Sequence, residues 1–299
     1  MSDIQENNLN LYSFSMQSDT IQHFILTRFN LRLWPHDKNG RENGTSEWLA
    51  HRFSIFERYC LPSLAGQTDG NFCWILLLDN GTPDEYRKRM EEYKVMCPQM
   101  NPVYVAKEQG RHFADVFRKE VAERTVADRI ITTYLDNDDC LARDFVKDVQ
   151  ERYASLPDHT FLSYADGYQL FSEFGLMLQI HYPRNHFMSV IEPRAGLRTV
   201  YGYGSHYYID RIPGARIEFV NDSRLWCEVV HGRNMGNDAY FIVGTQLVKD
   251  KNTVERAFSV DLGLKDNSRW MWFARFLPRY ARTFVQRARF RLFGRNWWK

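Results

Sequence analysis

Acidic side chains follow two predicted strands of this 299-residue sequence, and their spacing suits metal chemistry. Asp136, Asp138 and Asp139 come directly after one apolar stretch, and Asp79 follows another. In an extended chain, residues two apart point to the same side, so Asp136 and Asp138 can present their carboxylates together. Paired oxygen ligands of this kind suit Mg²⁺ or Mn²⁺. The alternative is that these acids are solvated residues at a helix start, with Asp139 capping a helix that begins near Leu141.

Alternating strand and helix patterns place these acids at one edge of a sheet. Strand-like apolar runs occur at residues 23–29, 72–78, 103–105 and 129–135. Helix-like spacing lies between and after them, at residues 46–60 with Ser46 as the expected N-cap, and at 83–93, 113–121 and 141–149. Such alternation predicts an α/β domain with a Rossmann-like, mainly parallel sheet, in which the continuous run 72–78 is buried on both faces. Ligands of such sheets bind beyond the carboxyl ends of the strands, where the acids lie.

The pattern changes after about residue 158. Residues 160–163, 168–171 and 176–180 form short strand-like stretches with little helix between them, which predicts an antiparallel extension of the sheet. Because no linker separates the parts, we expect one domain with two halves. The expected divisions are a polar N-terminal segment at 1–21, halves at 22–158 and 159–268, and a C-terminal helical tail at 269–299.

Several segments resemble the GT-A glycosyltransferases, in the same order along the chain. Residues 62–82, from Pro-Ser-Leu through Gln-Thr to Asp-Asn-Gly-Thr, are similar to the family-2 pattern, and Tyr-Leu-Asp-Asn-Asp-Asp at 134–139 is similar to its DxD element. More closely, residues 22–237 resemble the bacterial rhamnosyltransferase group, through Thr-Arg-Phe-Asn at 27–30, Trp-Leu at 48–49 with Arg52, and Val-Val-His-Gly-Arg-Asn at 229–234. The chain departs from family 2 at Asn80, where a second acid is usual, and it lacks the Gln-x-x-Arg-Trp motif of processive synthases.

The resemblance implies a metal-dependent glycosyltransferase. It would move a single sugar, rhamnose by the group's name, from a nucleotide-sugar donor to a glycan or lipid-linked acceptor in cell-surface polysaccharide synthesis, with inversion at the sugar. Residues 22–158 would bind the nucleotide sugar, and residues 159–268 would bind the acceptor. The alternatives are a nucleotidyl- or phosphotransferase on a similar sheet, and a non-catalytic, membrane-associated scaffold with a degenerate nucleotide site.

The resemblance also implies roles for the acids. Asp136 would bind the ribose or the metal, and Asp138 would bind the Mn²⁺ or Mg²⁺ that bridges the donor diphosphate. Asp79 would accept a hydrogen bond from the nucleobase, or it is a plain turn residue before Asn-Gly.

Three further residues take donor-side roles by resemblance. Thr27 and Arg28 would face the nucleobase and the diphosphate, and His231 would be a further ligand of the metal or the diphosphate. For Arg28 a simple salt bridge stays open as an alternative, and for His231 a hydrogen-bonded structural position. Arg52 is expected to be a structural residue or to pair on the donor side, rather than to act in catalysis.

Transfer also needs a base that takes the proton of the acceptor hydroxyl. We expect it in the acceptor-binding half, where Glu192 and His206 are the candidate bases; further titratable groups there are Asp166, Asp210 and Glu228. The stretch Tyr-Gly-Tyr-Gly at 201–204 fits either stacking on a sugar or a bulged strand.

The net charge of +2 divides into two unequal parts. Residues 269–299 hold nine Lys and Arg, no acid and ten aromatic side chains, whereas residues 1–268 hold 30 bases against 37 acids, a net charge of −7. A basic, aromatic helix predicts binding to an anionic membrane surface; the alternative is that it packs its aromatics on the domain. The acidic body argues against nucleic acid as a partner.

Other sequence features indicate where in the cell the protein is expected to act. The longest apolar run, residues 72–78, has seven residues against the roughly 20 that a membrane span needs. Residues 1–10 are polar and predict no secretory signal. Five scattered cysteines without a CxxC pair argue against a disulfide framework or a zinc site. We therefore expect a cytoplasmic protein, peripheral on the inner face of the cell membrane.

Overall fold

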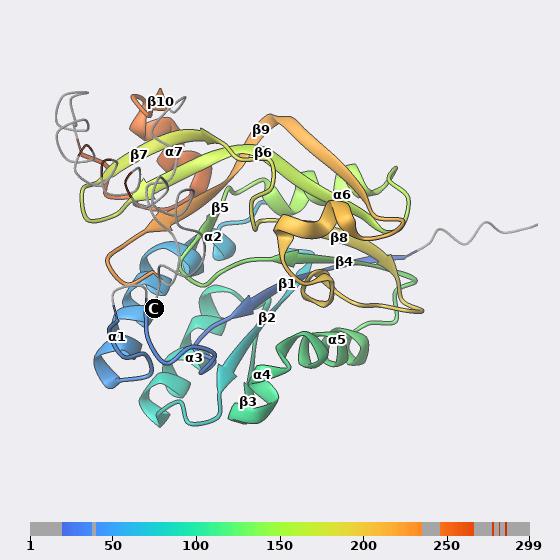
Figure 1. Cartoon of the computed structure of the whole chain (residues 1–299), viewed down its shortest axis with the longest axis horizontal. Helices are drawn as coiled ribbons and strands as arrows, with labels where there is room; N and C mark the ends of the chain where they lie inside the picture. The colour runs from blue at the N-terminus through green and yellow to red at the C-terminus, as the bar shows by residue number, and fades with distance from the viewer. Residues whose placement is uncertain are drawn as a thin grey trace, which may run out of the picture.

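The computed structural model describes residues 20–37, 40–234 and 246–265, together with Leu277, Ala281 and Val285. Within these residues the chain forms one ten-stranded mixed sheet with helices packed against it (Figure 1). The strand order is β10-β7-β6-β8-β4-β1-β2-β3, and β9 pairs with both β5 and β6. The α/β fold class predicted from the sequence is confirmed.

Four strands make the parallel part of the sheet. β1 pairs with β4 on one side and with β2 on the other, and β3 continues from β2. Their carboxyl ends therefore lie along one edge, where Arg28 and Asp79 end β1 and β2, and Asp136 follows β4. The bounds are β1 (Ile21–Arg28), β2 (Phe72–Asp79), β3 (Met100–Val105) and β4 (Arg129–Tyr134).

β6 organises the second half of the domain. It pairs antiparallel with β8 at its start and with β7 at its end, and parallel with β9 over most of its length. Because β8 also pairs with β4, hydrogen bonds run unbroken from the parallel part into the second half. The bounds are β5 (Cys140–Leu141), β6 (Thr160–Phe171), β7 (Leu176–His181), β8 (Ser189–Pro193), β9 (Arg216–Val230) and β10 (Gln246–Leu247).

Helices cover both faces of the parallel strands. Alternate residues of β2 enter opposite cores: Trp74 and Leu76 pack with side chains of α1, α3 and α6, while Ile75 and Leu77 pack with side chains of α5. The run 72–78 is thus buried on both faces, as its composition predicts. The helices are α1 (Ser46–Ile55), the π-helical η1 (Phe56–Cys60), α2 (Leu61–Ala65), α3 (Asp84–Met96), α4 (Lys107–Arg111), α5 (Phe113–Arg124), α6 (Phe145–Tyr153), the 3₁₀ turns η2 (Val200–Tyr203) and η3 (His206–Arg211), and α7 (Lys251–Phe258).

Some predicted boundaries are wrong. The N-cap of α1 is Thr45, whose hydroxyl accepts from the Trp48 amide over 3.1 Å, and not Ser46. Leu141 lies in β5, paired with Trp226 of β9, so the helix expected from residue 141 begins only at Phe145 and Asp139 does not cap it. The predicted strands 160–163 and 168–171 are one strand, because β9 pairs along both through two register shifts.

The predicted C-terminal tail, residues 269–299, lies outside the described residues except for Leu277, Ala281 and Val285. In the described part of the chain, no helix combines the length and the apolar character needed to cross a bilayer.

Candidate functional site

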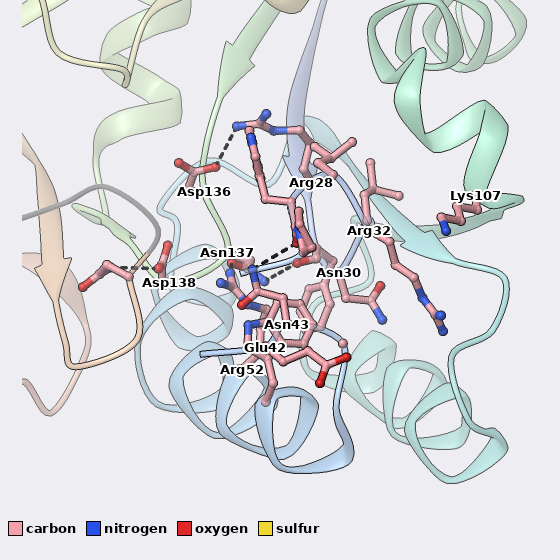
Figure 2. Close-up of a pocket in the computed structure, with 18 of the residues that line it drawn as sticks. Arg28, Asn30, Arg32, Glu42, Asn43, Arg52, Lys107, Asp136, Asn137 and Asp138 are labelled. Carbon is pink, nitrogen blue, oxygen red and sulfur yellow. Dashed lines mark hydrogen bonds and ion pairs between the residues drawn. The ribbon is translucent and has the colours of Figure 1, made fainter. Parts of the chain in front are cut away.

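A cleft of about 470 Å³ opens at the carboxyl ends of β1 and β4 (Figure 2). The loop after β1, helices α1 and α4, and the turn after β4 supply its walls. The charged groups that line it are five basic and three acidic side chains: Arg28, Arg32, Arg52, Lys107, Arg111, Glu42, Asp136 and Asp138. This excess of positive charge suits an anionic ligand such as a phosphate.

Arg28, the last residue of β1, is held between aromatic rings and an acid. Its guanidinium donates to the Tyr134 hydroxyl and lies 3.5 Å from Asp136 Oδ1. Burial opposes its charge, but Tyr134, Tyr201 and Asp136 outweigh burial and raise the pKa of Arg28. Four ring centroids lie 4.9–5.8 Å from the guanidinium carbon: those of Trp34, Phe113, Tyr134 and Tyr201. Arg28 is therefore a fixed cation at the wall of the cleft.

Asp136 is oriented by the same tyrosine. The Tyr134 hydroxyl lies 3.0 Å from each carboxylate oxygen of Asp136. About a third of the Asp136 side chain is exposed, at 31%, so the carboxylate stays accessible from the cleft. The Tyr134 hydroxyl thus contacts both Arg28, a cation of the kind that binds phosphate, and Asp136, an acid of the kind that binds a metal ion.

Asp138 is buried and contacts the loop that follows β9. His231 Nε2 and Asn234 Nδ2 lie 3.0 and 3.1 Å from the same carboxylate oxygen, Oδ2. Burial disfavours the ionised form, but the hydrogen bond from His231 and the charge of Arg52 lower the pKa of Asp138 to about 2. Asp138 is therefore ionised at neutral pH.

The hydrogen bonds of His231 fix its tautomer. The backbone N–H of Arg233 donates to Nδ1 over 3.2 Å. A neutral imidazole that accepts at Nδ1 carries its proton on Nε2, so His231 donates to Asp138. In this state Nε2 has no lone pair for a metal, and His231 orients the Asp138 carboxylate.

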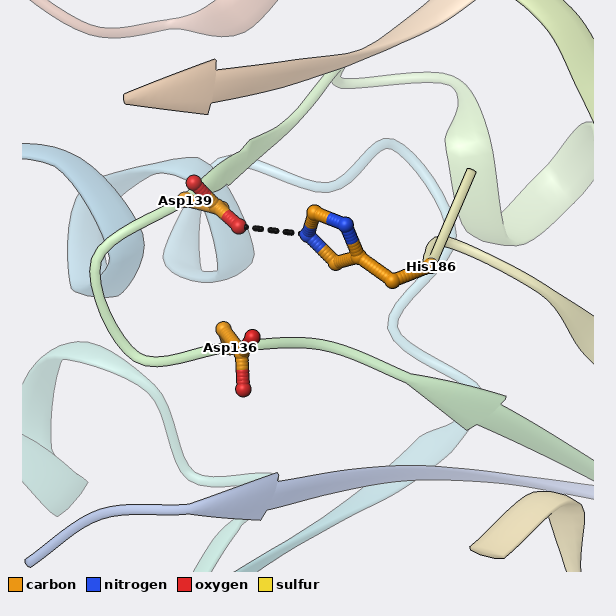
Figure 3. Close-up of side chains that lie close together, drawn as sticks. All are labelled: Asp136, Asp139 and His186. Carbon is orange, nitrogen blue, oxygen red and sulfur yellow. Dashed lines mark hydrogen bonds and ion pairs between the residues drawn. The ribbon is translucent and has the colours of Figure 1, made fainter. Parts of the chain in front are cut away.

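The third acid of the run, Asp139, meets a histidine that the sequence did not indicate (Figure 3). His186 Nε2 lies 2.8 Å from Asp139 Oδ2, and the Val229 amide donates to Oδ1 over 2.8 Å. Burial, then the neighbouring carboxylates, raise the pKa of Asp139. One ligand atom each from Asp136, Asp139 and His186 lies within 4.8 Å of the others, a donor set that could also hold a metal ion. His186 is a lone histidine without a motif, so no sequence signal could have found it.

Asp79 lies in a second pocket of about 240 Å³ that shares Asn30, Arg32 and Trp48 with the cleft. Its Oδ2 lies 3.5 Å from the Arg32 Nε, and its Oδ1 accepts from the Gly81 amide over 2.7 Å. The side chain thus combines the turn role with a position at the wall of a small pocket.

Two residues expected in the site lie elsewhere. Thr27 is fully buried, and its hydroxyl accepts from the indole N–H of Trp74 over 2.9 Å, because its side chain points into the core and not toward the cleft. Glu192 is buried beside Ile130, well before the carboxyl end of β4. Its carboxylate accepts three hydrogen bonds, from the Arg198 and Thr199 amides and the Tyr203 hydroxyl, and is a structural anchor for η2.

His206 lies closer to the acids. Its ring centroid is 6.1 Å from that of His186, whose imidazole contacts Asp139. Burial, and then the charge of His186, lower the pKa of His206 to about 3, so it is neutral at pH 7. The other titratable groups considered from the sequence have partners of their own: Asp166 with His181, Asp210 with Arg184, and Glu228 with Gln169.

Residues 201–204 do not form a bulged strand. Val200–Tyr203 is the turn η2, in which Tyr201 is buried against Arg28 and Tyr203 donates to Glu192. Arg52 of α1 stacks over Trp48, with its guanidinium carbon 4.9 Å from the ring centroid, and donates to Asn137. It braces the turn after β4 and also lines the cleft.

Comparison with known proteins gives the family. The family described as "Putative rhamnosyl transferase" matches residues 13–240. The chain therefore belongs to this family, and the membership expected from the sequence is confirmed together with the enzyme class of the family, glycosyltransferase. No curated protein matches the sequence.

Solved structures show distant likeness. S. aureus TarS 1-349 is 10% identical with a TM-score of 0.40, over 70% of this chain and 60% of that chain. The same protein in complex with UDP-GlcNAc is 11% identical with a TM-score of 0.39, over 74% of this chain and 62% of that chain. GalNAc-T7 with UDP, GalNAc and Mn²⁺ is 12% identical with a TM-score of 0.40, over 76% of this chain and 46% of that chain. The chain thus spans less than two thirds of the length of each.

Proposed function

We propose that this member of the rhamnosyl transferase family is a metal-dependent, inverting glycosyltransferase. It moves one sugar, rhamnose, from a nucleotide-sugar donor to a glycan or lipid-linked acceptor in cell-surface polysaccharide synthesis. The observation that carries the proposal is that Asp136 and Asp138 line one cleft with Arg28 and four further cations. A nucleotide diphosphate needs both kinds of group: basic side chains that bind its phosphates, and carboxylates that bind the metal cation associated with them.

The charge of the cleft and the two adjoining pockets support a position for the donor. Its diphosphate lies in the cleft, where Arg28 is held rigidly by the aromatic rings around it. Arg32 and Lys107 reach the same space from the loop after β1 and from α4 (Figure 2). The nucleobase occupies the adjoining pocket beside Asp79, which shares Arg32 and Asn30 with the cleft.

A divalent cation fits the acids of the cleft. Asp136 is accessible, and Asp138 is ionised with both of its side-chain donors on Oδ2. We assign Asp136 and Asp138 as the residues that would hold Mn²⁺ or Mg²⁺, with His231 orienting Asp138. When bound, such a cation stabilises the negative charge of the departing diphosphate.

The acceptor enters from the second half of the domain. Of the two bases expected from the sequence, only His206 lies near the acids, with its ring centroid 6.1 Å from that of His186. We assign it as the base for the acceptor hydroxyl. The test is the pH profile of a His206→Gln variant: loss of the acidic limb of kcat with unchanged donor affinity is expected, and an unaltered profile would refute the assignment.

The tail at 269–299 would hold the enzyme on the inner face of the cell membrane, near a lipid-linked acceptor. Its nine bases and its aromatic side chains support this role. Removal of the tail is expected to abolish binding to vesicles that contain phosphatidylglycerol and to leave nucleotide binding intact. Unchanged vesicle binding would contradict the membrane role alone.

The whole proposal is tested by a panel of nucleotide sugars with and without Mn²⁺. We expect calorimetry to show metal-dependent binding of one donor, and turnover to release a nucleoside diphosphate. Asp138→Asn should abolish the metal dependence, whereas Asp222→Asn, an exposed acid outside the cleft, should not. Release of a sugar 1-phosphate would instead favour a nucleotidyl- or phosphotransferase, and absence of any metal-dependent nucleotide binding would favour a scaffold.

A further inference from the structure

Three tyrosines lie in the segments beside His206, two of them exposed. Tyr207 and Tyr208 in η3 are 52% and 53% exposed, and the partly buried Tyr182 follows β7. The Tyr182 hydroxyl donates to the Tyr207 hydroxyl over 2.9 Å. We call Tyr182, Tyr207 and Tyr208 the tyrosine platform. Large aromatic side chains exposed in a group often mark a binding surface.

Polar contacts hold η3, which carries two of the three tyrosines. Arg184 and Asp210 form an ion pair at 3.0 Å that connects the segment after β7 to η3. The Arg211 guanidinium carbon lies 4.7 Å from the centroid of the Tyr208 ring. Ser205 caps η3 by accepting from the Tyr207 amide. The rings are therefore presented in a defined arrangement, which lowers the entropy lost when a ligand binds.

The platform lies next to the groups assigned to the reaction. The ring centroids of Tyr207 and His206 are 4.0 Å apart, and His206 is 6.1 Å from His186. His186 contacts Asp139 and has a ligand atom within 4.8 Å of one on Asp136 (Figure 3). A molecule lying on the platform can thus reach toward the acids from the side of His206.

We infer that the tyrosine platform binds the saccharide chain of the acceptor. This deepens the proposed function and rests on it. The apolar C–H faces of sugar rings stack on tyrosine rings, while sugar hydroxyls can bond to phenol groups and to charged residues such as Arg184 and Asp210 at the platform. Phenol rings beside the Arg184–Asp210 ion pair suit this mixed chemistry better than they suit an acyl chain, which needs continuous apolar area. The acceptor is accordingly recognised through sugars beyond the one that receives the new residue.

The test uses the full chain, an array of short oligosaccharides of hexose, deoxyhexose and N-acetylhexosamine, and glycan-free phosphatidylglycerol vesicles. We expect the protein to bind at least one oligosaccharide. The double variant Tyr207→Ala, Tyr208→Ala should lose about tenfold in affinity for it, because two stacking contacts are removed. The matched variant Tyr207→Phe, Tyr208→Phe keeps the rings and should stay within about threefold.

Equal glycan affinity of the alanine and phenylalanine variants would overturn the inference, as would a protein that binds no oligosaccharide. Binding to the vesicles that falls only in the alanine variant would identify lipid as the ligand and would also overturn it. Nucleotide binding is measured in parallel on each variant. If nucleotide binding fails while glycan binding depends on the rings, the proposed function fails and the platform stands; the reverse result rejects the platform alone.

Discussion

The imidazole of His231 lies 3.0 Å from the carboxylate of Asp138, although 93 residues separate the two in the chain. Removing this donor in His231→Ala leaves a buried carboxylate with less support and frees its orientation. We expect the affinity for Mn²⁺ in the presence of a nucleoside diphosphate to fall about 10- to 100-fold, as measured by calorimetry. His181→Ala, which removes an exposed histidine bonded to Asp166, is the control and should bind normally. Equal affinity of both variants would show that His231 does not support the site.

Arg28→Lys tests whether the planar cation matters. An ammonium group keeps the charge but cannot present a flat face to the rings around Arg28 or donate through several N–H groups at once. We expect donor affinity to fall roughly tenfold with little loss of stability. Arg118→Lys on the exposed side of α5 is the matched change and should have no effect. A donor affinity that is unchanged in Arg28→Lys would remove Arg28 from the diphosphate site.

Glu192→Gln separates a structural role from a catalytic one. Each of the three groups that contact Glu192 is a donor, so the amide of Gln must turn an N–H₂ toward one of them. We expect the free energy of unfolding to fall by about 1–3 kcal/mol in urea titrations, with kcat reduced only modestly. A stable variant with kcat lowered a thousandfold would instead restore Glu192 as a base.

The buried His23 should make the protein sensitive to mild acid. Its Nε2 lies 2.8 Å from Thr133 Oγ1, and burial lowers the pKa of His23 from 6.5 to about 3. Below pH 6.5 His23 is protonated in the unfolded chain, whereas in the folded protein it stays neutral down to about pH 3. The free energy of unfolding therefore falls as the pH falls through this window. The slope from this group approaches about 1.4 kcal/mol per pH unit.

His23→Gln should therefore flatten the dependence of the unfolding free energy on pH between pH 7 and pH 5. Its stability at pH 7 will also change, so the slope is the quantity compared. Identical slopes in wild type and His23→Gln would refute the assignment of acid sensitivity to His23.

Gly167 in β6 allows Trp226 of β9 to lie against the backbone. A Cβ at Gly167 would fall 2.2 Å from the Trp226 ring, whose N–H donates to the Tyr164 carbonyl over 2.7 Å. Gly167→Ala should destabilise the protein by about 1–3 kcal/mol through overpacking, measured by thermal or urea unfolding. If the cause is this contact, Trp226→Leu should cost less in the Gly167→Ala background than alone. Additive effects would point to another cause.

Local sequence patterns are sufficient to predict the parallel strands and the acidic residues at their ends. The alternation of apolar runs and helical spacing locates β1 to β4, and the edge formed by parallel strands then brings Arg28 and Asp136 together. Chain direction alone cannot tell which way a strand-end side chain points. The sequence therefore predicts Thr27 as a donor-site residue, whereas its hydroxyl is buried against Trp74.

The remaining site contacts depend on pairing between distant strands. His186 lies 47 residues after Asp139 in the chain. It contacts Asp139 only because β8 and the segment before it lie alongside β4. Leu141 lies in a strand rather than a helix because it pairs with Trp226 of β9. As a carboxylic acid in the second half of the domain, Glu192 is a candidate base. Its three hydrogen-bond donors come from a turn that no sequence pattern predicts.

The contacts between the acids and β9 also set an order for chain folding. Asp138 and Asp139 obtain donors from Val229, His231 and Asn234, which are synthesised some 90 residues after the acids themselves. Until that segment arrives, the growing polypeptide would have to bury two adjacent carboxylates without these three donors, so the turn that carries them stays open to water. The parallel strands can therefore pair early on the ribosome, whereas the site becomes organised only when β9 is in place, and ribosome-bound chains that stop short of residue 229 should not bind a nucleotide with metal.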